Sequence, residues 1–450
     1  MRQQDIFASS QILAFNPILK ENAEIKAQYF HYLKKLIRLV KWDKRKYTKA
    51  QLDFYRKTLC GEEPIAHIPK ENIIPTRMCY LMPYDLAIIL AYHSKVIHTE
   101  KITIIVNKIA ADFNLPAQLA DFLYREFDAA LGDTKVWEEV LNNKAINEYK
   151  QFLKTVKENI LFVRQYPYRL LITATMSAGK STLINALVGK NISLMQNMAC
   201  TSKVHCIVSK PIEDGVSSEY DHDLSLNASK EDLLSDNENN FSAKITVGTY
   251  FNSGLAGRRV ILLDSPGVNS SENEEHCKIS QKIIRSRRYK LLLYVMNATQ
   301  LATNDEYQHL EFVKKHIGRA DILFVMNKID SLNFEEENLT DVIEDQRRFL
   351  CNIGFREPII CPVSARAAYL AQKSQQTELA RFERHELYNY MDKFEQNSMA
   401  EYYENILHSS SITNPDDEAE LLLKNCGFAY FEKIVAFYSN GGKMNGTDLC

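Results

Sequence analysis

The sequence predicts an α/β domain with a mainly parallel sheet, preceded by an all-helical N-terminal domain. In residues 1–160, apolar side chains recur at helical spacing, without short β-branched runs bounded by turns. After about residue 160, short apolar runs alternate with charged segments of helical spacing, which is typical of a parallel sheet covered on both faces. The 450 residues suffice for two or three domains with cores of their own.

The helical pattern is clearest in the stretch EIKAQYFHYLKKLIRLV, residues 24–40. Its apolar side chains fall on one helical face: Ile25, Tyr29, Leu33, Leu36, Ile37 and Val40. Residues 84–113 and 115–131 continue the pattern. We therefore place the helical N-terminal domain at residues 1–160.

Five short, nearly all-apolar runs are expected to form strands: 169–174, 259–264, 290–298, 321–327 and 357–365. The α/β domain is placed at residues 161–440, with a disordered tail at 441–450. Residues 211–242 interrupt the alternation, and within them the stretch 213–240 carries many acids and one lysine. That composition predicts a flexible acidic insertion.

The composition is that of an ordinary globular protein, with a net charge of −2. Nucleic acid is therefore an unexpected partner, and an anionic membrane would have to be met by a local patch. Nine cysteines without C-x-x-C spacing indicate reduced thiols rather than disulfides or zinc. The N-terminus lacks a signal-peptide pattern and no apolar run is long enough to span a membrane, so a cytoplasmic location is expected.

The first candidate site follows the run 169–174 and reads TATMSAGKST. A phosphate-binding loop has the pattern G-x-x-x-x-G-K-[ST], and Ala174 stands at its opening glycine. Gly179 allows close backbone approach, Lys180 supplies positive charge and Ser181 is expected to hold Mg²⁺. The loop residues expected to bind nucleotide are Ala178, Gly179, Lys180, Ser181 and Thr182. The alternative is an ordinary strand–turn–helix with a chance GKST.

A second motif, LLDSPGVN, places Asp264 at the end of an apolar run and Gly267 three residues later. In a D-x-x-G loop the aspartate reaches Mg²⁺ through water and the glycine N–H meets the γ-phosphate. The stretch MACTSKVHCIV offers Thr201 as the threonine that closes on Mg²⁺ and the γ-phosphate, with Ser202 as its rival.

A third motif, VMNKID, gives Asn327, Lys328 and Asp330 in N-K-x-D spacing. Its carboxylate would accept two N–H bonds from the guanine edge, which adenine does not present. The stretch CPVSA offers Ser364 and Ala365, whose backbone is expected to meet the guanine O6. Together the ordered motifs predict a P-loop GTPase domain that binds GTP and GDP, enlarged because 84 residues separate Lys180 from Asp264.

The stretches MSAGKSTLINALVG, ACTSKV, LLDSPGVNSSENEEH, LYVMNATQLATNDE and FVMNKID resemble the bacterial branch of the dynamin superfamily of large GTPases. The resemblance covers about residues 161–440. It implies catalysis by P-loop and switch residues (Lys180, Ser177 and Thr201), completed when two G domains meet. Ser177 matches the serine that helps hold a monovalent cation, K⁺ or Na⁺, and Thr201 matches the threonine that positions water. Val268 follows D-x-x-G, where the family also lacks a catalytic glutamine.

Two departures from the family leave alternatives open. Eukaryotic dynamins carry a glutamine directly before the loop serine, where this chain has Met176, so a slow GTP-dependent switch or adaptor that recruits a partner is the alternative function. The sequence does not continue into the long helical stalk of membrane-remodelling members, so the stalk is expected to be absent, split off, supplied by a partner chain or replaced in part by the N-terminal helices. Homodimers or hetero-oligomers through the G domain are expected, with peripheral membrane contact as a further possibility.

The stretch 34–57 bears on that membrane contact because it has ten basic residues against Asp43 and Asp53. It is interpreted either as a patch that binds an anionic membrane or nucleic acid or, preferably, as the solvated face of a helix whose apolar stripe packs on its neighbours.

Overall fold

The computed structural model describes residues 3–44, 46–61, 71–90, 99–192, 204–221, 224–228, 244–266, 274–407 and 417–442. The chain divides into two compact units. The helical unit comprises Met1–Tyr166 and Lys210–Lys230, and the sheet unit comprises Pro167–Ser209 and Glu231–Cys450. Each unit has a hydrophobic core of its own.

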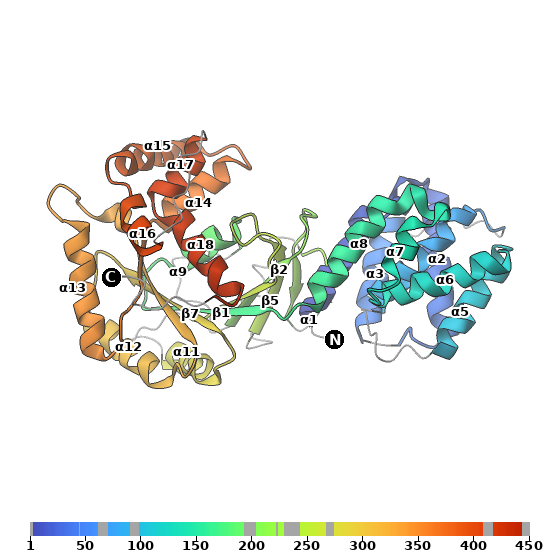
Figure 1. The fold of residues 1–450 in the computed structure, drawn as a ribbon, viewed down its shortest axis with the longest axis horizontal. Coiled ribbons are helices and arrows are strands. Elements are labelled where there is room, and N and C mark those ends of the chain that lie inside the picture. Colours follow the sequence, from blue (N-terminus) through green and yellow to red (C-terminus); the bar gives the residue numbers. More distant parts are fainter. Residues whose placement is uncertain are drawn as a thin grey trace. The chain divides into compact units, whose positions relative to one another are not determined.

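The helical unit is built from short helices around one core (Figure 1). Its α-helices are α1 (Gln3–Ser10), α2 (Ala23–Leu39), α3 (Lys46–Cys60), α4 (Met82–Ile89), α5 (Thr99–Asp112), α6 (Ala117–Ala130), α7 (Trp137–Asn142) and α8 (Lys150–Arg164). Its 3₁₀ helices are η1 (Gln11–Phe15), η2 (Pro17–Lys20), η3 (Thr76–Tyr80) and η4 (Lys144–Tyr149).

Helix α2 shows how the sequence produces this packing. It begins where the Asn22 side chain accepts the Ile25 N–H at 2.9 Å, which satisfies one of the free donors of the first turn. The apolar face predicted from spacing is buried, with Leu33, Leu36 and Ile37 fully inaccessible. The apolar stripe of the basic stretch therefore packs inside the unit, as the preferred interpretation requires, and leaves basic side chains such as Arg38 exposed.

The core of the helical unit also contains a buried carboxylate that is well supplied with hydrogen bonds, that of Asp85. Its oxygens accept hydrogen bonds from Asn16 Nδ2 (2.8 and 2.9 Å), Tyr29 Oη (2.5 Å) and Tyr55 Oη (2.8 Å). Burial raises the pKa of Asp85 to about 6, and the three donors oppose that rise by stabilising the charged form. The network links residues that lie far apart in the sequence.

Part of the acidic stretch, where a flexible insertion was predicted, forms a hairpin in the helical unit. Strands β3 (Ser218–Tyr220) and β4 (Leu224–Ser225) pair antiparallel, and Lys210 stabilises the segment before them. The Lys210 ammonium is buried and donates to Asp214 at 3.0 Å and to the Val216 carbonyl at 2.8 Å. Lys210 lies just before the acidic stretch. The composition of the stretch alone therefore could not indicate that a buried lysine binds Asp214 within it. Residues 222–223 and 229–243, and the tail from 443, lie outside the described residues.

The sheet unit contains the predicted, mainly parallel sheet. Its strands are β1 (Tyr168–Ala174), β2 (Val204–Lys210), β5 (Lys244–Tyr250), β6 (Val260–Asp264), β7 (Leu291–Asn297), β8 (Asp321–Asn327) and β9 (Ile360–Val363). They lie in the order β5-β2-β6-β1-β7-β8-β9. The pairs from β6 to β9 are parallel, whereas β2 runs antiparallel to β6. The predicted fold class is confirmed.

Helices cover both faces of this sheet (Figure 1). One face carries α9 (Lys180–Val188), α14 (Ala365–Ser374), α15 (Arg381–Gln396), α16 (Ala400–Leu407), α17 (Glu418–Asn425) and α18 (Phe428–Ser439). The other carries α11 (Glu274–Ser286), α12 (Asn304–His316) and α13 (Leu339–Ile353), and the short η5 (Ile329–Ser331) follows β8.

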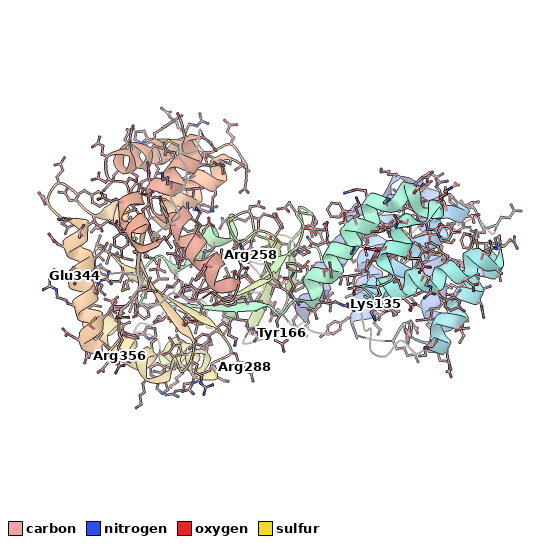
Figure 2. The ribbon with its side chains drawn as sticks, in the orientation of Figure 1. Lys135, Tyr166, Arg258, Arg288, Glu344 and Arg356 are labelled. Atoms are coloured by element: carbon pink, nitrogen blue, oxygen red, sulfur yellow. The ribbon has the colours of Figure 1, made fainter. Side chains whose placement is uncertain are left out.

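Helix α13 illustrates this covering layer. It buries Ile343 and Leu350 against the sheet, and Gln346 Nε2 donates to Met296 Sδ at 3.1 Å. Glu344 lies on its outer surface (Figure 2). Across the described ranges of both units, none of the helices combines the length and apolar character needed to cross a membrane.

Candidate nucleotide-binding site

The predicted site residues gather where the parallel strands end. Ile172 of β1 lies opposite Asp264 of β6, and Ala174 lies opposite Val295 of β7. One strand further, Asn327 of β8 ends opposite Val363 of β9. The carboxyl ends of β6, β1, β8 and β9 therefore meet at one edge, where open α/β sheets bind their ligands.

The glycine loop has the backbone geometry of an anion-binding turn. Ala174, at the position of the opening glycine, is fully buried at the end of β1. Ser177 (φ 61°) and Gly179 (φ 82°) adopt left-handed conformations, and α9 begins at Lys180. The free N–H groups of the first helical turn, which includes Ser181, therefore point toward the loop, as phosphate binding requires.

The lysine of this loop meets the aspartate of the second motif. Lys180 Nζ donates to Asp264 Oδ1, and both side chains are largely buried, with 13% and 11% of their surfaces exposed. Ser265 holds the turn after β6 in place, because its Oγ donates to the Ile172 carbonyl at 3.0 Å. The ammonium group expected to face phosphate is thus in contact with the carboxylate expected to reach Mg²⁺ through water.

The donor atoms near this point fit a magnesium ion held together with a nucleotide. Asp264 supplies a carboxylate and Ser181 a hydroxyl, and Mg²⁺ prefers such oxygen ligands. Among the described residues, there is no group of three or more His, Cys, Asp or Glu side chains that could hold a metal by themselves. Magnesium at this site would therefore depend on phosphate oxygens and water for its remaining ligands, which is usual in nucleotide sites.

Asn327 ties the base-recognition motif to the phosphate loop. Its Nδ2 donates to the Ala178 carbonyl at 2.9 Å, and its Oδ1 accepts the Ala365 N–H at 3.0 Å. Three loops from distant parts of the sequence therefore meet at one buried side chain. Gly179 packs against it so closely that a β-carbon there would lie 2.3 Å from Asn327 Nδ2.

Asp330 follows on the short helix η5, after Lys328 in a left-handed conformation (φ 65°). The Ser364 hydroxyl donates to Asp330 Oδ1 at 2.5 Å, which orients the carboxylate. The backbone N–H groups of Ser364 and Ala365 donate to the carbonyl of Cys426 (3.1 Å) and to Asn327. Their expected contact with the guanine O6 stays a prediction.

Some predicted residues cannot be placed. Thr201, its rival Ser202, Gly267 and Val268 lie outside the described residues. Met176 lies on the phosphate-binding loop, and 49% of its surface is exposed.

The structure adds site residues that the motifs did not indicate. Lys393 of α15 donates to the backbone carbonyls of Asp330 and Leu332, both at 2.7 Å. Lys393 lies 63 residues after Asp330, and no spacing pattern connects the two positions.

A second added group lies behind the loop. Thr173 Oγ1 lies 3.1 Å from His309 Nε2 inside the sheet unit. Burial lowers the pKa of His309 to about 4, so the ring is neutral at pH 7. Nearby on α12, Glu306 Oε2 accepts the Ala302 N–H at 2.7 Å, and burial raises the pKa of Glu306 to about 7.

Comparison with known proteins agrees with this site. Residues 170–329 match the sequence model described as the Dynamin family. A tRNA modification GTPase MnmE from Petrotoga mobilis is 23% identical over 205 residues, covering 44% of this chain and 34% of that protein. Sulfate adenylyltransferase subunit 1 from Aliarcobacter butzleri is 21% identical over 226 residues, covering 50% of this chain and 43% of that protein. The chain thus spans less than half the length of these curated relatives.

Solved structures with weak overall similarity were also found. A chain of an oligomerised bacterial dynamin pair shows 15% identity and a TM-score of 0.38, covering 91% of this chain and 66% of that one. Aquifex aeolicus Era shows 16% identity and a TM-score of 0.28, covering 45% and 52%. Residues 170–329 match the family model and supply the phosphate-binding loop and the central strands of the sheet. These residues form a GTPase domain of the dynamin family.

Proposed function

We propose that this protein binds GTP with Mg²⁺ and hydrolyses it to GDP and phosphate. The observation that carries the proposal is the convergence of Lys180, Asp264 and Asn327 at one sheet edge, with Asp330 oriented beside them. The first two provide the charges that a triphosphate and its metal require, and the last two supply the groups that recognise guanine. The family match of residues 170–329 supports the same reading.

Each residue has a distinct task in this proposal. Lys180 and the N–H groups at the start of α9 stabilise negative charge on the β- and γ-phosphates, as phosphoryl transfer demands. Ser181 and Asp264 would hold Mg²⁺, which when bound neutralises charge on the phosphates. Asp330 accepts the guanine N–H donors. Thr201 is proposed to position water and to close on the metal.

Three further parts of the proposal rest on the D-x-x-G motif, for Gly267, and on the family resemblance, for Ser177 and the pairing of G domains. Gly267 donates its N–H to the γ-phosphate, and Ser177 helps to hold a monovalent cation, K⁺ or Na⁺. Two G domains, from copies of this chain or from a partner, face each other to complete the site. Peripheral contact with an anionic membrane would use exposed basic side chains of residues 34–57.

Nucleotide preference tests the central assignment. Affinities for GTP and ATP are measured by titration with Mg²⁺ for the wild type, Asp330→Ala and the control Asp341→Ala. Asp341 is an exposed aspartate in the first turn of α13, so its removal changes the same charge away from the site. We expect GTP to bind far more tightly than ATP, and only Asp330→Ala to remove the preference. Equal affinity of the wild type for both nucleotides would refute the assignment.

A slow GTP-dependent switch is the second candidate function. The observation favouring it is Met176, which stands on the loop where eukaryotic dynamins have a water-orienting glutamine and which lacks the amide of that side chain. Turnover per molecule, measured against protein concentration, separates the candidates. A steep rise indicates activation by G-domain pairing, whereas a flat and slow rate indicates a switch.

A further inference from the structure

The turn that carries Asp330 is bound through its backbone by the side chain of Lys393 of α15. Its ammonium group donates to the carbonyls of Asp330 and Leu332, both at 2.7 Å, and lies 5.0 Å from the centre of the Phe334 ring. The neighbouring Phe394 packs edge-on against the same ring, with centroids 6.5 Å apart. Helix α15 thus contacts the segment that follows β8 through two adjacent residues.

This turn has two backbone hydrogen bonds of its own, from Ser331 N–H to the Lys328 carbonyl (2.9 Å) and from Leu332 N–H to the Ile329 carbonyl (3.2 Å). Helix η5 spans only Ile329–Ser331 and follows Lys328, whose positive φ of 65° is a strained conformation for a residue with a β-carbon. Carbonyl groups at the end of a helix have no partner within it. A cation that donates hydrogen bonds to two such carbonyls fixes the backbone of the turn. Its positive charge also complements the partial negative charge of those carbonyl oxygens.

We propose that Lys393 is a positioning residue for base selectivity, which fixes the Asp330 carboxylate in the place where guanine is recognised. This inference rests on the proposed GTP-binding function and extends it to a residue on another helix. Ser364 orients the carboxylate through its 2.5 Å hydrogen bond, and Lys393 fixes the backbone that carries this carboxylate. Recognition by two parallel hydrogen bonds tolerates displacements of only about 0.5 Å, so the position of the turn decides how much of the guanine contact is retained.

The first test compares two nucleotides on one variant. Lys393→Met keeps an unbranched apolar stem beside Phe334 and removes the charge. Inosine triphosphate lacks the exocyclic amino group of guanine and therefore makes one fewer hydrogen bond to Asp330. We expect the affinity for GTP to fall about tenfold and the affinity for inosine triphosphate to fall distinctly less. Lys393→Arg should restore most of the GTP affinity. Retained binding of inosine triphosphate also shows that the variant is folded.

The matched control is Lys373→Met. Lys373 of α14 is also a partly buried lysine beside α15, but its ammonium group binds the Glu383 carboxylate at 2.6 and 2.8 Å and does not contact the turn. This variant should leave the ratio of GTP to inosine triphosphate affinity unchanged. A similar loss of ratio in both lysine variants would mean that α15 matters only as packing, and would overturn the inference.

A double-mutant cycle shows whether Lys393 acts through Asp330. In an Asp330→Ala background, Lys393→Met should cause no further loss of GTP affinity, because the group that it positions is gone. Additive losses, or equal losses for the two nucleotides, would overturn the inference. If the wild type prefers GTP and Lys393→Met keeps that preference, the inference about Lys393 is refuted and the proposed GTP-binding function is not. A wild type without any GTP preference would refute the proposed function itself.

Discussion

At the scale of single residues, Gly179 shows what the phosphate loop requires. Its φ of 82° favours glycine, and a β-carbon there would lie 2.3 Å from Asn327 Nδ2. Replacement by alanine must therefore displace the side chain that joins the phosphate loop to the base-recognition loops. The motif predicted close approach to a ligand, and the structure adds close approach to a neighbouring amide.

We predict that Gly179→Ala lowers GTP affinity by roughly 5- to 150-fold, because a shift of Asn327 costs roughly 1–3 kcal/mol in lost hydrogen bonds. The control is Gly257→Ala, since Gly257 also has a positive φ (67°) but has no heavy atom within 4 Å of the added carbon. Both variants carry similar backbone strain, and only the first should lose nucleotide binding in a titration. Equal affinities for the two variants would contradict the steric argument.

At the scale of helices and strands, the sequence predicted those elements whose own residues form a recognisable apolar pattern. The run 321–327 coincides with β8, and 169–174 lies within β1, because buried parallel strands are apolar throughout. Strand β5 (Lys244–Tyr250) gave no such run, because KITVGTY mixes polar residues and glycine with apolar ones. Asn327 and Asp330 were found by spacing, whereas Lys393 reaches the same turn only through the packing of a distant helix.

Helix α12 supports a prediction about pH, because Glu306 in its first turn is buried and binds the Ala302 N–H. Burial raises the pKa of Glu306 from 4.5 to about 7, so the native state holds a proton that the unfolded chain releases. This contribution to the free energy of unfolding is complete below pH 4.5 and is lost as the pH rises to about 7. Glu306→Gln stays neutral at every pH and should not show the loss.

We therefore expect the stability of Glu306→Gln relative to the wild type to rise by about 2 kcal/mol between pH 5 and pH 7, and only slightly further to pH 8. Denaturant unfolding at several pH values measures the difference. The control is Glu311→Gln, an exposed change on the same helix that removes the same charge. Parallel stability curves for Glu306→Gln and the wild type would contradict the assigned pKa.

At the scale of the whole molecule, the chain has two cores and two sets of buried polar contacts. The helical unit depends on Asp85 and its donors, and the sheet unit has its own core beneath the nucleotide site. A ligand stabilises only the cooperative unit that binds it, by about 2.7 kcal/mol at a hundred times its dissociation constant. Two separate cores therefore predict two unfolding transitions, of which GTP raises one.

Matched tyrosine variants test this prediction, because each unit has a buried tyrosine hydroxyl that donates one hydrogen bond. Tyr55 Oη donates to Asp85 at 2.8 Å in the helical unit, and Tyr403 Oη donates to the Pro362 carbonyl at 2.9 Å in the sheet unit. Replacement by phenylalanine should cost roughly 1–3 kcal/mol in each case, since a buried acceptor loses its donor. In differential scanning calorimetry, Tyr55→Phe should lower the transition that GTP does not move, and Tyr403→Phe the one that it raises. If either variant shifts both transitions equally, the two units unfold as one, and the GTPase domain depends on the helical unit for its stability.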